Sequence, residues 1–150
     1  NRQFETLNFG RCFPYKYDNR HDINVAITHN WNDRMDFSMA WIFTSGNAIT
    51  LPIANYRSAG EGRYYYSDDV LHYDARNSYR MKNYHRLDLS FSWWKDKKWG
   101  QRKWTLGIYN AYSRLNPFFI DFGFDREGNK KFIQYSLFPI IPSFSYSFKF

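Results

Sequence analysis

The chain has 150 residues, a formal net charge of +7 and 23% aromatic residues, yet its mean hydropathy is only −0.71. No stretch approaches the ~18 consecutive apolar residues of a membrane-spanning helix, and the single cysteine, Cys12, cannot form an internal disulfide, so both a helical membrane protein and a disulfide scaffold are excluded. Abundant aromatic residues in a polar chain are typical of a transmembrane β-barrel, whose short strands face lipid on one side only.

Two segments near the start of the chain alternate in polarity. Residues 22–31 and 35–44 each carry mainly apolar side chains at odd positions and mainly polar or small ones at even positions. Because successive side chains of a strand point to opposite faces, both segments are predicted to be strands. The turn-forming residues 32–34 between them predict a hairpin.

The long segment 45–84 has no periodicity and is predicted to be a loop. Loops of this length are usually functional or disordered, and so many aromatic residues argue against disorder. Tyrosine rings offer rigid area for stacking on sugars, aromatic chelates or peptides. The predicted ligand-binding residues are Arg63, Tyr64, Tyr65, Tyr66, His72, Tyr73 and Arg76. The alternative, given equal weight, is that these rings pack the loop onto its neighbours.

Alternation resumes in the second half, and three further strands are predicted, at 86–94, 104–124 and 132–150. The chain ends on an aromatic ladder whose other parity holds small hydroxyl residues and Lys149. The closing strand of an outer-membrane barrel needs such a pattern. The ladder is therefore predicted to be a barrel-terminal assembly signal, made of Phe144, Tyr146, Phe148 and Phe150.

The connectors alternate between long and short along the chain. In an antiparallel barrel, consecutive connectors lie at opposite rims, so the longer ones, about 1–21, 45–84 and 125–131, are predicted to be outer loops. Five strands cannot close a transmembrane barrel, for which about eight is the minimum. The predicted fold class is therefore all-β, an antiparallel up-and-down transmembrane barrel segment that belongs to a larger sheet.

Tryptophans gather at or near the ends of the predicted strands, mostly beside the short connectors, as expected of an aromatic girdle at the membrane interface. They are Trp31, Trp41, Trp93, Trp94, Trp99 and Trp104.

No pattern in the chain predicts catalysis, a metal site or a cofactor. His21, His29, His72 and His85 have no ligand spacing, and neither a nucleophile elbow nor a phosphate-binding glycine loop is present. The basic residues between 95 and 103 lack an accompanying RNA-binding motif, so a solvated turn is predicted there and no nucleic-acid partner.

Five segments, in the same order along the chain, resemble the C-terminal end of TonB-dependent outer-membrane transporters of Bacteroidota. These are residues 13–22, 45–52, 75–90, 107–118 and 138–150. The resemblance implies a barrel of about 22 strands with an N-terminal plug domain. It further implies location in the Gram-negative outer membrane and import of a scarce nutrient, such as an iron chelate, vitamin, oligosaccharide or peptide. The implied partners are the TonB complex, outer-membrane lipid and lipopolysaccharide, the barrel assembly machinery and, optionally, a surface lipoprotein.

Two other interpretations remain open at this point. A soluble β-sandwich that binds a ligand such as carbohydrate would bury Ile23, Phe37, Leu89 and Phe144 against a second sheet. A small self-contained barrel with a hydrolytic or structural role would need about eight to twelve strands in total.

Overall fold

The structure is a computed structural model that describes residues 3–57, 69–127 and 130–150. Within these residues the chain is all-β, with antiparallel pairing throughout, no α-helix and one short 3-10 turn, η1 (Asn8–Gly10). The chain divides into two compact units. The smaller comprises Asn1–Asn19 with Gly46–Met81, and the larger comprises Arg20–Ser45 with Lys82–Phe150.

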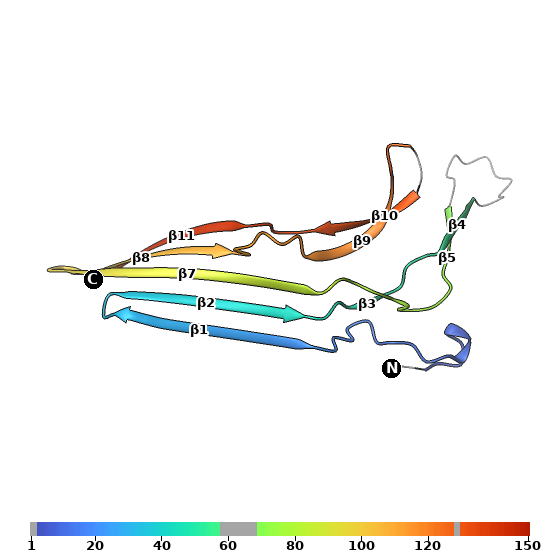
Figure 1. The fold of residues 1–150 in the computed structure, drawn as a ribbon, viewed down its shortest axis with the longest axis horizontal. Helices are drawn as coiled ribbons and strands as arrows, with labels where there is room; N and C mark the ends of the chain where they lie inside the picture. Colours follow the sequence, from blue (N-terminus) through green and yellow to red (C-terminus); the bar gives the residue numbers. More distant parts are fainter. Residues whose placement is uncertain (1–2, 58–68, 128–129) are drawn as a thin grey trace. The chain divides into compact units, whose positions relative to one another are not determined.

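The larger unit contains a sheet of five antiparallel strands in the order β1-β2-β7-β8-β11, which Figure 1 shows side by side. The strands are β1 (Asp22–Asn32), β2 (Met35–Thr44), β7 (Tyr84–Lys97), β8 (Gly100–Tyr109) and β11 (Ile141–Lys149). The spatial order of these five strands is the same as their order along the chain, and neighbours are antiparallel, so the sheet is an up-and-down meander.

The pairing register gives this sheet one apolar and one polar face. Across the apolar face, one row of paired positions holds Ile27, Met39, Leu89, Ile108 and Pro142. Across the polar face, the neighbouring row holds Thr28, Ser38, Ser90, Gly107 and Ser143. Because all five strands keep this register, the alternation in the sequence becomes a continuous separation of the two faces.

No second layer covers the sheet within the part of the chain that the structure describes. All eleven residues of β1 and all nine of β11 are exposed. Ile23 is 48% exposed and Phe144 64%, although both belong to the apolar face. The buried hydrophobic residues among those described, Phe13 and Ala48, both lie in the smaller unit.

Two very short connectors join strands at one end of the sheet. Asp33 and Arg34 link β1 to β2, where the Asn32 side-chain oxygen accepts a hydrogen bond from the Arg34 amide at 2.9 Å. Lys98 and Trp99 link β7 to β8. Gly100 follows with φ 142°, and a Cβ there would collide with the Lys149 carbonyl, so the turn requires glycine.

The turn between β7 and β8 is shorter than the sequence predicts. A polar connector is expected over 95–103, but Lys95 pairs with Arg102 and Lys97 with Gly100 as continuing strand. Backbone pairing does not require apolar side chains, so a strand end made of charged residues shows no hydrophobic alternation in the sequence.

The prediction of one continuous strand over 104–124 is wrong. This segment divides into β8 and β9 (Pro117–Phe124), because Asn110 and Ser113 adopt positive φ values of 52° and 54°, which interrupt the extended backbone. The predicted strand over 132–150 likewise divides into β10 (Lys130–Ser136) and β11, with Phe138 at φ 55° between them.

Strands β9 and β10 pair with each other as a separate hairpin. The predicted outer loop 125–131 is therefore the connection inside this hairpin, and Lys130 and Lys131 already belong to β10. Residues 128–129 of that loop lie outside the described residues.

The smaller unit contains two short antiparallel pairs. They are β3 (Ala48–Ile49) with β6 (Tyr79–Arg80), and β4 (Ala54–Arg57) with β5 (Asp69–His72). Among its described residues, the segment 45–84, predicted to be a loop, therefore carries four short strands. Its residues Gly46–Met81 form one compact unit with Asn1–Asn19.

Candidate ligand-binding site

The predicted binding residues fall into three groups in the structure. Arg63, Tyr64, Tyr65 and Tyr66 lie outside the described residues. His72 ends β5, and its carbonyl accepts a hydrogen bond from the Ile53 amide at 2.8 Å.

Tyr73 and Arg76 follow β5 and line the same open depression, of about 670 Å³. The full lining is Leu7, Lys16, Ile49, Thr50, Tyr73, Arg76 and Asn77. The N-terminal segment and the segment 46–81 both contribute to it, within one compact unit. The structure therefore brings together two of the predicted residues with five that the sequence analysis did not select.

Asn77 fixes one wall of this depression. It is buried and has φ 53°, a left-handed conformation that asparagine tolerates better than most residues. Its side-chain amide donates to the Pro14 carbonyl at 2.8 Å, while its backbone amide donates to Thr50 Oγ1 at 3.0 Å. One residue thus joins the N-terminal segment to the region around β3.

Arg80 makes a second junction in the same unit. Its guanidinium donates to the Asp18 carbonyl at 2.6 Å and to the Gly46 carbonyl at 2.7 Å, and it forms an ion pair with the Asp18 carboxylate at 2.6 Å. The rigid fork of arginine suits such simultaneous contacts. Arg80 therefore holds the residues before β1 against the start of the segment 46–81.

The two cations of the depression have no carboxylate within ion-pair distance among the described residues. The Arg76 guanidinium instead lies 5.7 Å from the centre of the Phe13 ring, and Lys16 Nζ lies 5.6 Å from that of Tyr17. These contacts hold the cations against aromatic faces and leave them without a neutralising partner.

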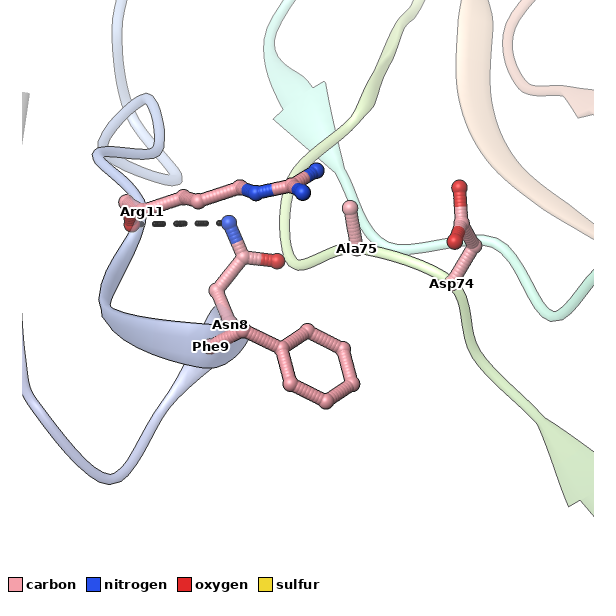
Figure 2. A pocket seen from close by; sticks show the side chains of 5 residues that line it. All are labelled: Asn8, Phe9, Arg11, Asp74 and Ala75. Carbon is pink, nitrogen blue, oxygen red and sulfur yellow. Dashed lines mark hydrogen bonds between the residues drawn. The ribbon is translucent and has the colours of Figure 1, made fainter.

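A second depression, of about 360 Å³, is lined by Asn8, Phe9, Arg11, Asp74 and Ala75 (Figure 2). Figure 2 shows the Arg11 side chain extending toward Ala75 above the Asn8 amide. The Asn8 side-chain oxygen accepts a hydrogen bond from the Arg76 amide at 3.2 Å. Residues 73–76 therefore contribute to both depressions.

The polar face of the sheet carries a separate charged cluster around Arg86. Its guanidinium donates to the Tyr109 hydroxyl at 2.7 Å and lies 4.2 Å from the centre of that ring, and its Nε is 2.9 Å from Asp88 Oδ2. Tyr84 accepts a further hydrogen bond at 3.1 Å. Arg86 Nε itself has no hydrogen-bond partner among the described residues, but the guanidinium charge is already paired with Asp88, so the cluster stabilises the start of β7 and offers little to a ligand.

The terminal aromatic residues lie on the apolar face, where neighbouring rings contact one another. Tyr146 lies 5.7 Å from Trp104, which in turn stacks on Trp93 at 5.9 Å. Phe148 meets Phe150 edge to face at 4.7 Å. Phe144, in the same series, pairs with Leu106 of β8.

The tryptophans are spread over the ends of the sheet. Trp31 and Trp99 are strongly exposed beside the two short connectors. Trp41 instead lies toward the other end of β2, opposite Val25 and Leu87. Trp94 belongs to the polar face, with Lys103 Nζ 5.3 Å from its ring centre.

Two asparagines that the sequence analysis did not select organise the connection after β8. Asn110 is fully buried, and its side chain donates to the Arg114 and Phe138 carbonyls at 2.9 and 3.1 Å and accepts from the Arg114 amide at 3.1 Å. The Asn116 amide accepts from the His85 amide at 3.0 Å and donates to the His85 carbonyl at 2.9 Å. Their only sequence signal is an asparagine on either side of a break in the hydrophobic alternation.

Comparison with known proteins returns no relatives: no family model matches the chain, and neither a curated protein nor a solved structure shows a significant match. Among the described residues no helix is long and apolar enough to cross a bilayer. In the same residues, no three His, Cys, Asp or Glu side chains gather where they could hold a metal ion.

Proposed function

We propose that this chain forms five strands and the outer loops of a large outer-membrane β-barrel that imports a scarce nutrient into the periplasm. The observation that carries the proposal is the exposed, continuous apolar face of a single-layered, five-stranded sheet. A large apolar surface without a covering layer marks a site of contact with membrane or protein.

The dimensions of the sheet support lipid as the contact. Its strands have 9 to 14 residues, and a tilted strand needs about 9–11 to cross the hydrocarbon core of a bilayer. The aromatic row of Trp93, Trp104 and Tyr146 lies near the end with the short connectors, as an interfacial girdle would.

The connectors support the same orientation. The two-residue links between β1 and β2 and between β7 and β8 would lie at the periplasmic rim, and the long segments after β2 and β8 would lie outside. The outer strands β1 and β11 each pair with one neighbour among the described residues. In lipid their free edges would need further strands, as in a barrel of about 22.

The alternative of a soluble β-sandwich is less well supported. A sandwich requires the apolar side chains of one sheet to interdigitate with those of another. Ile23 and Phe144, which would belong to that core, are 48% and 64% exposed.

Import driven by TonB rests on the family resemblance of the sequence. In that proposal the compact unit of residues 3–19 and 46–81 is the ligand-capturing part of the outer surface. The plug domain and TonB would act through other parts of the barrel, and lipopolysaccharide would contact the apolar face.

Fractionation of cells that produce the intact protein tests the membrane location. We expect the protein in the outer-membrane fraction, soluble only in detergent, with its tryptophan fluorescence quenched by brominated lipid. Recovery in the soluble periplasmic fraction without detergent would exclude the barrel and favour the sandwich.

A further inference from the structure

We infer that the depression lined by Lys16, Tyr73 and Arg76 binds a carboxylate-bearing ligand that also presents the face of a sugar or aromatic ring. The inference deepens the proposed function, on which it rests, because it names the class of nutrient that the outer surface would capture.

The charges around the depression favour an anion. Its lining contains two cations and no carboxylate. The nearby Asp18 carboxylate is already paired with Arg80 at 2.6 Å. Lys16 and Arg76 therefore keep their positive charge uncompensated by any described residue, and an incoming carboxylate would replace water around both.

The arginine is held ready for such a ligand. Its backbone amide is bonded to Asn8, and its guanidinium lies 5.7 Å from the centre of the ring of Phe13, which is only 4% exposed. A guanidinium held in this way loses less conformational entropy on binding and can donate two parallel hydrogen bonds to a carboxylate.

The remaining lining favours a ring over a simple inorganic anion. Tyr73 is 48% exposed and shares the depression with the apolar residues Leu7 and Ile49. A tyrosine face stacks on sugar or aromatic rings. The volume of about 670 Å³ is also in the range of sites for ligands of a few rings.

Two kinds of nutrient share this chemistry, an oligosaccharide of uronic acids and an aromatic carboxylate chelate of iron. The test measures binding of trigalacturonate and of the ferric complex of 2,3-dihydroxybenzoate to the intact protein in detergent, with maltotriose as the neutral probe. We expect one acidic probe to bind, more weakly at higher salt because screening reduces the attraction, and maltotriose to bind poorly.

The variants assign the binding to this depression. Arg76→Gln and Lys16→Gln should each weaken binding of the acidic probe about tenfold, the loss expected for one charge-assisted contact. Arg76→Lys, which keeps the charge, should retain more affinity than Arg76→Gln. Arg126→Gln, a matched removal of an exposed cation in the turn after β9, should change nothing.

Failure of both acidic probes to bind, or equal losses of affinity for Arg76→Gln and Arg126→Gln, would overturn the inference. The proposal of an outer-membrane barrel would still stand after such a result if the protein fractionates with the outer membrane. Conversely, if the protein is recovered in the soluble fraction and still binds the acidic probe specifically, the inferred ligand class is supported and the proposed transporter is excluded.

Discussion

The sheet and the smaller unit are ordered in different ways. In the sheet, long strands pair backbone to backbone, and the apolar side chains stay at the surface. In the smaller unit, strands of two to four residues are joined by hydrogen bonds from a few side chains, chiefly those of Asn77 and Arg80, to distant carbonyls. The sheet therefore depends on a pattern repeated over many residues, and the smaller unit on single residues that have no substitute.

This contrast predicts that the substitution with the largest loss of unfolding free energy lies outside the regular strands. Asn110→Ala removes three hydrogen bonds in the connection after β8 and places alanine at φ 52°. We expect the free energy of unfolding to fall by about 3–5 kcal/mol, because each buried group left without a partner costs about 1–3 kcal/mol. Urea unfolding of the intact protein in lipid measures it. A loss no larger than that of Asn30→Ala on exposed β1 would contradict the role given to Asn110.

The two faces of the sheet should differ in how well they tolerate an arginine. Met39→Arg on the apolar face should destabilise the membrane-inserted protein by about 2–4 kcal/mol, as an arginine near the bilayer midplane does. Ser90→Arg, on the polar face of the paired strand, is the matched control and should be better tolerated. Heat-modifiability on gels and urea unfolding report assembly. Equal tolerance of both substitutions would refute the assignment of the apolar face to lipid.

The smaller unit should lose local order when Arg80 is replaced. Arg80→Gln removes the fork that joins Asp18 and Gly46, at a cost of about 1–2 kcal/mol, because the ion pair is partly exposed. Hydrogen–deuterium exchange should become faster in residues 46–57 and 69–81 and stay unchanged in the strands of the sheet. Faster exchange across the whole protein would show that the two regions do not unfold separately.

The smallest effect on stability is expected from shortening the connection between β4 and β5. Arg57 and Asp69 are paired neighbours, so a Gly-Asn turn can replace residues 58–68, which include Arg63 and Tyr64–Tyr66. We expect the free energy of unfolding to change by less than about 0.5 kcal/mol, as for surface changes in general. Ligand uptake by cells should nevertheless fall. Unchanged uptake would exclude these tyrosines as binding residues.

Strands β1 and β2 follow the sequence prediction closely because their alternation runs through their whole length. The ends of β7 and β8 do not, since their polar residues carry no hydrophobic signal. The break after β8 was missed because Asn110 and Asn116 act on residues 28 and 31 positions away, Phe138 and His85. Even-numbered apolar positions resume at Phe118 and Ile120 beyond the break, so periodicity predicts one continuous strand.

The depression shows a similar limit. The sequence predicts Tyr73 and Arg76 because aromatic and cationic residues in a long loop suggest binding. It does not predict Lys16, which lies in another segment and joins them only through the packing of the N-terminal residues against 46–81. Residue type can therefore predict some residues of a binding site, whereas the full set of lining residues depends on contacts between distant segments.

The Asn116 side chain has a consequence for the N-terminal end of β7. Beyond the point where β8 turns away, its primary amide supplies the donor and acceptor that a neighbouring peptide group would offer to His85. One side chain thus satisfies the backbone N–H and C=O of His85. It thereby covers a strand edge that could otherwise pair with a strand of another molecule. Aspartate, nearly identical in shape, has no donor for the His85 carbonyl, so Asn116→Asp would leave that carbonyl unsatisfied.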